Sequence, residues 1–214
     1  MRKVNVGVLG SGDVGKVLAG GFASIGHDVT IGSRSPEKLD AFVAEHERIS
    51  SGTFEEAARF GDMIVLATLG TATEEALRMA GLGNFDGKVV IDAANPLAHE
   101  AGQPPRLASG QDDSLGERVQ RLLPKAKVVK AFNTVGNGLM IHPELPGGPP
   151  DMFIAGNDAD AKKIVSQVCE AFGWGVVDVG GIESARYLEA MCMTWVMAGI
   201  VSGRWDHAFK LLRK

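Results

Sequence analysis

The stretch Val4-Asn5-Val6-Gly7-Val8-Leu9-Gly10-Ser11-Gly12-Asp13-Val14-Gly15 decides the fold that we expect for this chain. Residues 4–9 form a short apolar run typical of a buried parallel strand, and apolar residues at helical spacing follow. In the glycine turn between them, Gly10 allows the tight bend, Gly12 lets a pyrophosphate approach the backbone, and Gly15 lets the helix pack closely on the strand. A helix N-terminus also favours phosphate. The predicted dinucleotide-binding residues of this turn are Gly10, Ser11, Gly12, Asp13, Val14 and Gly15.

The bulk composition limits the class of protein. With 214 residues, of which 45% are hydrophobic and 22% charged, the chain suits one globular domain. The 22 basic and 26 acidic residues give a net charge of −4, which disfavours nucleic acid or an anionic membrane as the main partner. We recognise no signal peptide or membrane-spanning run, and Cys169 and Cys192 do not form a disulfide pattern. We therefore expect a cytoplasmic protein.

The residues after the second expected strand indicate which dinucleotide binds. In an NAD site this position usually holds an acidic residue that binds the ribose 2′-hydroxyl. Here Gly32 and Ser33 are followed by Arg34, and Lys38 comes four residues later. A guanidinium and an ammonium suit the 2′-phosphate of NADP. The sequence therefore predicts NADP(H) as the cofactor.

Hydrophobic periodicity predicts a Rossmann-type α/β fold, with a doubly wound, mostly parallel sheet and added C-terminal strands and helices. We expect one domain over 1–214, with a dinucleotide-binding core at 1–135 and an extension at 136–214. The later strands are expected at 28–31, 49–51, 62–69, 88–92, 126–132, 151–155 and 175–179. The later helices are expected at 36–46, 53–60, 72–80, 115–123, 158–172 and 183–202, with a helical tail at 205–212 and a loop at 99–114.

Ligands bind outside the carboxyl ends of the strands in such sheets. Thr68 and Leu69 end one expected strand, and Asn95 lies in a rigid Asn-Pro turn after the next. Asn133 and Thr134 follow the strand at 126–132 and are expected on the nicotinamide side of the cleft.

No acid–base catalytic residue stands out. The only tyrosine, Tyr187, lacks a lysine four residues later, and the hydrolase and metalloprotease signatures are missing. His99 and His142 lie in expected loops, and Lys130 lies inside an apolar strand. Alcohol oxidation needs a base, whereas hydride exchange between NADP and a flavin-like ring needs mainly two stacked rings. We therefore predict no catalytic residue and no metal site. We do expect a small-molecule redox co-substrate. A reductase of small imines or carbonyls and a non-catalytic NADPH sensor remain alternatives.

The chain resembles the coenzyme F420-dependent NADP oxidoreductases over nearly its whole length. The resemblance rests on the motifs at 8–15, 32–38, 128–134, 153–163 and 177–186. It implies that Ser33, Arg34 and Lys38 hold the 2′-phosphate and that Thr68 and Leu69 line the ribose–nicotinamide path. It also implies that Asn133, Thr134 and Val135 face the deazaflavin, so that F420, or FMN or FAD, is the expected co-substrate. The Ala131-Phe132-Asn133 motif and the late pattern of Gly181 followed four residues later by Ala185 are similar to the NADPH-binding cytoplasmic domain of the Steap metalloreductases.

Residues 190–201 carry apolar side chains almost all round the expected helix. Such a helix is normally buried. We expect it either in the core or in the interface of a homodimer.

Overall fold

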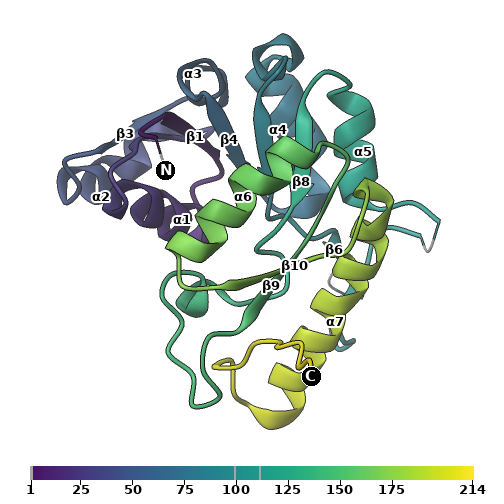
Figure 1. Ribbon diagram of the computed structural model, residues 1–214. Helices are drawn as coiled ribbons and strands as arrows, with labels where there is room; N and C mark the ends of the chain where they lie inside the picture. Colours follow the sequence, from purple (N-terminus) through teal and green to yellow (C-terminus); the bar gives the residue numbers. More distant parts are fainter. Residues whose placement is uncertain (1, 99, 111) are drawn as a thin grey trace.

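The computed structural model describes residues 2–98, 100–110 and 112–214, so the predictions for His99 and for position 111 of the loop lie outside the described residues. Its centre is an eight-stranded sheet in the order β10-β9-β8-β5-β4-β1-β2-β3 (Figure 1). All neighbouring strands are parallel except β8 and β9, so β9 and β10 run against the other six. The strands are β1 (Asn5–Leu9), β2 (Asp28–Gly32), β3 (Ile49–Gly52), β4 (Met63–Leu66), β5 (Val89–Asp92), β8 (Lys127–Lys130), β9 (Asp151–Gly156) and β10 (Gly175–Asp178).

Helices cover both faces of this sheet, as the predicted doubly wound fold requires. The α-helices are α1 (Asp13–Ser24), α2 (Asp40–Ala44), α3 (Phe54–Phe60), α4 (Thr73–Ala80), α5 (Leu115–Leu122), α6 (Ala159–Ala171) and α7 (Ala185–Ser202). Short 3₁₀ turns are η1 (Pro36–Leu39), η2 (Gly70–Ala72), η3 (Leu82–Phe85), η4 (Asn137–Leu139) and η5 (Ile182–Ser184). Thr53 and Glu56 form the capping box that begins α3.

Alternation along the central strands divides the core into two layers. In β4, Met63 and Val65 join the cluster that contains α1 and α6, whereas Ile64 and Leu66 join the cluster that contains α3, α4 and α5. Successive side chains of a strand point to opposite faces, so an uninterrupted apolar strand is buried on both sides. The Rossmann-type α/β prediction is therefore confirmed, although several strands end earlier than predicted; β4 spans Met63–Leu66 rather than 62–69.

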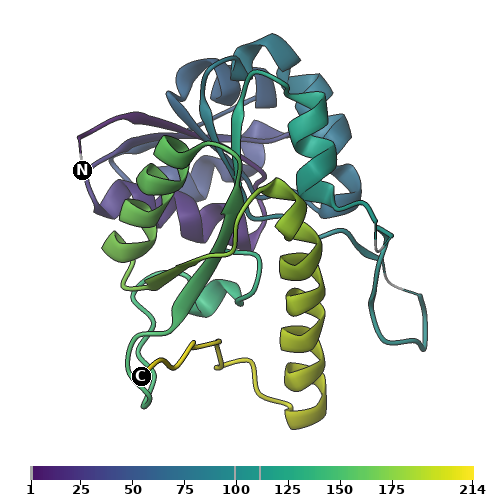
Figure 2. The same cartoon turned by 45° about the vertical axis from the view of Figure 1, so that its right-hand side comes forward.

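Two predicted segments differ in the structure. The loop predicted at 99–114 contains β7 (Arg106–Leu107), which pairs antiparallel with β6 (Leu97–Ala98). The tail predicted as a helix at 205–212 has no regular secondary structure (Figure 2). Its backbone instead bonds to the start of β9, where Asp151 N donates to Phe209 O at 2.9 Å and Asp151 Oδ2 accepts from Leu211 N at 2.8 Å. These contacts replace the helical hydrogen bonds.

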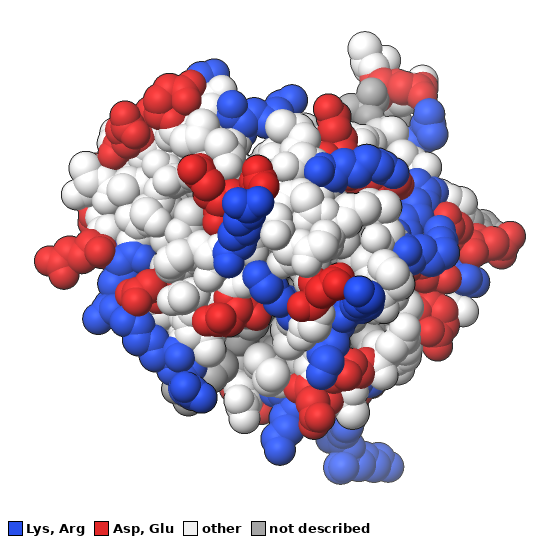
Figure 3. Space-filling view, turned by 90° about the horizontal axis from the view of Figure 1, so that it is seen from above, with Lys and Arg blue, Asp and Glu red and all other residues white. Residues whose placement is uncertain are grey.

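Helix α7 is only partly buried within one chain, so the core alone does not account for its apolar side chains. Leu188, Cys192, Trp195 and Val196 pack inward, whereas Tyr187, Met197, Ile200 and Val201 are exposed. The apolar side chains around α7 are therefore only partly covered within one chain. No helix in the described ranges is both long and apolar enough to cross a bilayer. On the face seen from above, acidic and basic side chains are intermixed (Figure 3).

Candidate functional site

The glycine turn between β1 and α1 gives each of its glycines a distinct environment. Gly10 has φ +127°, and a Cβ there would collide with the carbonyl of Ala67. A Cβ on Gly15 would collide with the carbonyl of Gly10. Around Gly12, by contrast, a Cβ would meet no atom of the described structure within 4 Å. Only Gly12 therefore leaves open space above the backbone, at the start of α1, where a pyrophosphate would fit.

The remaining residues of the turn connect it to helix α1 and to the end of β2. Gly12 is the N-cap of α1, and Asp13 lies exposed in the first helical turn. Val14 is partly buried and packs against the core, so it anchors the helix. Ser11 is also partly buried, and its Oγ lies 3.1 Å from Ser33 Oγ at the end of β2.

The segment after β2 presents two cations to solvent. Ser33 is only 8% exposed, and its Oγ accepts from Ser35 N at 3.1 Å, which folds the loop back. Arg34 and Lys38 are exposed, and within the described ranges neither forms an ion pair. Their charges therefore remain available beside a serine that already touches the glycine turn.

Thr68 and Leu69 follow β4 and border the same edge. Thr68 Oγ1 lies 2.9 Å from Thr73 Oγ1, which in turn donates to Leu69 O at 3.2 Å. The Leu69 side chain is 80% exposed. A Cβ on Gly70 would collide with the carbonyl of Asn95, so the loops after β4 and β5 touch.

Asn95 and Asn133 form a reciprocal pair at the ends of β5 and β8. Asn95 Nδ2 donates to Asn133 O at 2.8 Å, and Asn133 Nδ2 donates to Asn95 Oδ1 at 3.0 Å and to Leu188 O at 2.9 Å. Asn133 is 2% exposed, and its Oδ1 has no hydrogen-bond partner in the described structure. An unpaired buried acceptor costs about 1–3 kcal/mol, so this oxygen is suited to accept a bond from a ligand donor.

The two residues after Asn133 are buried rather than open to the surface. Thr134 is 3% exposed, and Val135 is 7% exposed and belongs to the core layer of α1 and α6. The backbone just before Asn133 is unusual, because Phe132 has φ +61°. A non-glycine residue in this region is uncommon and is held by its surroundings.

A buried cluster of three charges at this edge was missed by the sequence analysis. Lys130 Nζ lies 2.9 Å from Asp92 Oδ2 and 3.0 Å from Glu189 Oε1, and all three side chains are at most 1% exposed. We call these three residues the buried triad. Burial lowers the pKa of Lys130, but the two carboxylates more than offset this, so the pKa is raised and the ammonium stays charged. Burial, partly opposed by Lys130, raises the pKa of Asp92.

Two signals in the sequence could have revealed the triad. Lys130 interrupts an apolar strand, and Glu189 is the only charged residue between Arg186 and Arg204. A charge that is to be buried in an apolar element needs a partner. Their pairing depends on the contact between β8 and α7, which local periodicity does not predict.

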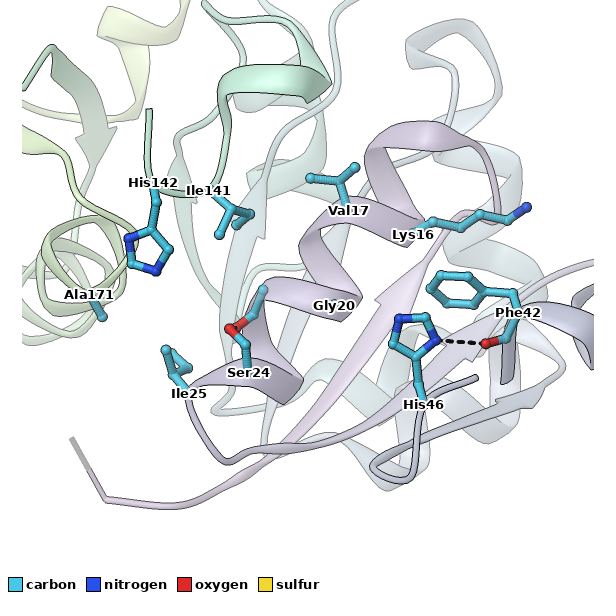
Figure 4. Close-up of a pocket in the computed structure, with 11 residues that line it drawn as sticks. Lys16, Val17, Gly20, Ser24, Ile25, Phe42, His46, Ile141, His142 and Ala171 are labelled. Atoms are coloured by element: carbon cyan, nitrogen blue, oxygen red, sulfur yellow. Dashed lines mark hydrogen bonds between the residues drawn. The ribbon is translucent and has the colours of Figure 1, made fainter. Parts of the chain in front are cut away.

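A shallow hollow of about 670 Å³ lies elsewhere, on the outer face of α1 (Figure 4). Val17, Ile25 and Ile141 give it apolar walls, and the His46 imidazole donates from Nδ1 to Phe42 O at 2.7 Å. None of the predicted cofactor-binding residues lines it. The carboxyl edge of the sheet is therefore the better candidate. Among the described residues, no group of three or more histidine, cysteine or acidic side chains is arranged to hold a metal ion.

Comparison with known proteins identifies the family. The chain is 30% identical to the F420-dependent NADP reductase of Methanocaldococcus jannaschii over 194 residues, covering 85% of this chain and 86% of that protein. The chain belongs to the F420-dependent NADP oxidoreductase family. It is accordingly an NADP-dependent oxidoreductase. The family described as "NADP oxidoreductase coenzyme F420-dependent" matches residues 5–96, the segment from β1 to the Asn95-Pro96 turn.

Two further proteins also resemble this family member over most of its length. The crystal structure of a protein from Arthrobacter sp. FB24 that is proposed to be an F420-dependent NADP reductase is 38% identical, covers 98% of this chain and 100% of that chain, and has a TM-score of 0.94. Metalloreductase STEAP3 of Rattus norvegicus is 31% identical over 87% of this chain. The chain spans only 36% of the length of STEAP3.

Proposed function

We propose that this protein transfers a hydride between NADP(H) and a deazaflavin of the coenzyme F420 type, at the carboxyl edge of the sheet. The observation that carries the proposal is the make-up of this edge. Hydroxyls and amides follow β4, β5 and β8 at Thr68, Asn95 and Asn133, and the charged side chains of the buried triad are already paired. In the described structure the edge thus offers positioning groups rather than an acid–base pair. Such a site suits hydride transfer between two rings.

The residues present fit NADP(H). The open space at Gly12 would take the pyrophosphate, and Arg34 and Lys38 would neutralise the 2′-phosphate. Ser33 would orient this loop through its contact with Ser11. The unpaired Oδ1 of Asn133 would accept a hydrogen bond at the nicotinamide end, next to Asn95. Bound NADPH supplies the hydride from C4 of its nicotinamide.

The names of two relatives support F420 as the other substrate, because both the M. jannaschii protein and the Arthrobacter protein are named for it. The experiment is stopped-flow mixing of the NADPH-loaded protein with F420 and, separately, with FMN. We expect rapid bleaching of F420. Bleaching of FMN alone would make a flavin the acceptor. Turnover of cyclic imines without bleaching of either would instead support an imine reductase. Tight NADPH binding with no transfer to any acceptor would indicate a sensor.

We also propose that α7 pairs with a second copy of the chain. Its exposed side chains between 187 and 203 are uncharged, and Val201 is 82% exposed. Contiguous exposed apolar surface of this kind is typical of interfaces. Sedimentation equilibrium should give twice the chain mass of 22.6 kDa, and Val201→Glu should give the single-chain mass. A single-chain mass for the unaltered protein would contradict this proposal.

We propose the cytoplasm as the site of action. Both cysteines are buried and free in the structure, and burial raises the pKa of the Cys192 thiol to about 11. Unpaired thiols are typical of proteins from reducing compartments.

A further inference from the structure

We propose that the buried triad of Asp92, Lys130 and Glu189 positions the nicotinamide end of the cleft, acting through Ala94, Asn95 and Asn133. The inference rests on the proposed function only in placing the nicotinamide at this edge. The three side chains are at most 1% exposed, so a nucleotide bound at the surface of this edge would not touch them. They are positioning residues.

The first link is formed by hydrogen bonds between the buried triad and the backbone of Ala94. Lys130 Nζ donates to Ala94 O at 2.6 Å, and Asp92 Oδ1 accepts from Ala94 N at 3.0 Å. Both backbone polar groups of Ala94 are therefore held by triad members. Hydrogen bonds to charged groups are stronger than neutral ones, so this peptide is tightly fixed. Asn95 follows directly in the chain.

The second step runs from Asn95 to Asn133 and back to α7. The two side chains exchange hydrogen bonds, and Asn133 Nδ2 also donates to the carbonyl of Leu188. Leu188 precedes Glu189, the triad member on α7. The contacts therefore close into a ring through β5, β8 and α7. A displacement of any one element moves the Asn95–Asn133 pair.

The third step adds helix α5. Glu189 accepts from Leu115 N and Gly116 N, both at 3.1 Å, and from Ser109 Oγ at 3.3 Å. Its carboxylate thus satisfies the free backbone donors at the start of α5, where negative charge is favoured. Through this one side chain, the segment that leads from β7 to α5 is connected to the same ring.

Stability alone is a poor explanation for the triad. Packing an ammonium and two carboxylates in the core is costly, and apolar side chains of similar volume often hold a core as well. The charges instead provide directional bonds to both backbone polar groups of Ala94 and to the backbone donors at the start of α5. The same edge holds the strained backbone of Phe132, whose φ is +61°. Strain of this kind is concentrated at functional sites, which agrees with a positioning role.

The test is the substitution Glu189→Gln. It removes one of two negative charges and leaves Lys130 paired with Asp92, so no buried charge is left without a partner. We expect NADPH affinity within about twofold of the unaltered protein, because the phosphate contacts are untouched. We expect hydride transfer to F420 to slow by about tenfold or more, because the nicotinamide ring of NADPH is misplaced. The fluorescence lifetime of the bound NADPH nicotinamide should also change. Glu183→Gln, at an exposed glutamate just before α7, is the matched control and should behave like the unaltered protein.

A second pair of variants addresses the β8 side. Lys130→Gln should reproduce the loss in rate and the lifetime change, whereas Lys127→Gln, in the same strand at a half-exposed ion pair with Asp158, should not. A measurement on the unaltered protein covers the case in which the triad variants do not fold. NADPH should shift the side-chain amide NMR signals of Asn95 and Asn133, but not that of Asn84, which is bonded to Ala80 O.

Three results would overturn the inference. They are a folded Glu189→Gln protein with unchanged lifetime and rate, a Lys130→Gln protein that behaves like Lys127→Gln, and Asn95 and Asn133 signals that ignore NADPH. Failure of the proposed function is distinguishable from these. Without transfer to F420 in the unaltered protein, a lifetime change in Glu189→Gln would still support positioning by the triad.

Discussion

Ser11 Oγ lies 3.1 Å from Ser33 Oγ, and this contact joins the glycine turn to the loop that carries Arg34. The two residues are 22 positions apart in the chain and meet because β1 and β2 are parallel neighbours whose carboxyl ends share an edge. The turn that would hold the pyrophosphate and the cations that would hold the 2′-phosphate are therefore parts of one surface.

Substitution of Arg34 tests the nucleotide preference. Arg34→Ala should weaken NADPH binding by about 1.5–3 kcal/mol, because a charge-assisted bond to the 2′-phosphate is lost. NADH binding, which involves no such phosphate, should not change. Titration calorimetry with both nucleotides measures this, and Arg59→Ala, at an exposed ion pair on α3, is the matched control. Equal affinities of the unaltered protein for NADPH and NADH would refute the assignment.

The glycines of the turn should separate folding from binding. Gly12→Ala should change the free energy of unfolding by less than about 1 kcal/mol, because its φ of −76° suits any residue and its surroundings are open. The same change should abolish NADPH binding, since the added methyl group occupies the phosphate space. Gly10→Ala should destabilise the fold by at least about 1–3 kcal/mol, because its φ is +127°. Urea unfolding and NADPH titration give the two readouts. Full NADPH affinity in the Gly12→Ala protein would contradict a pyrophosphate site at Gly12.

The ion pair between Glu117 and Arg186 should make stability depend on pH. Hydrogen bonds from Arg186, reinforced by Ser114, lower the pKa of Glu117 from 4.5 to about 2. Because this pKa lies below that of the unfolded chain, the stabilisation is complete above about pH 4.5 and is lost as pH falls towards 2. With the partial exposure of Arg186 taken into account, it amounts to about 1–3 kcal/mol.

Urea unfolding at pH 7 and at pH 3, compared with Glu117→Gln, isolates this contribution. The difference in unfolding free energy between the two proteins should shrink at the lower pH. A difference that stays constant would show that this ion pair contributes no pH-dependent stability.

Much of the fold could be predicted from the sequence because local patterns determine it. The apolar run before Gly10 and the capping box at Thr53 specify a strand and a helix within a few residues. The tail at 205–212 could not be predicted, because its hydrogen bonds go to Asp151, far away in the sequence. The reciprocal pairing of Asn95 with Asn133 and the buried triad are likewise long-range. Both depend on β5, β8 and α7 meeting, which no local pattern encodes.

Isotope labelling tests most directly whether the protein transfers a hydride from NADPH to F420. The protein is loaded with NADPH that is deuterated at one face of nicotinamide C4, in separate experiments for the two faces. It is then mixed with F420 for a single turnover, and the reduced deazaflavin is analysed by mass spectrometry. We expect that the deuterium from one of the two faces is found in the reduced F420 and that none from that face enters water. Deuterium released to water, or unreduced F420 beside protein saturated with NADPH, would contradict it.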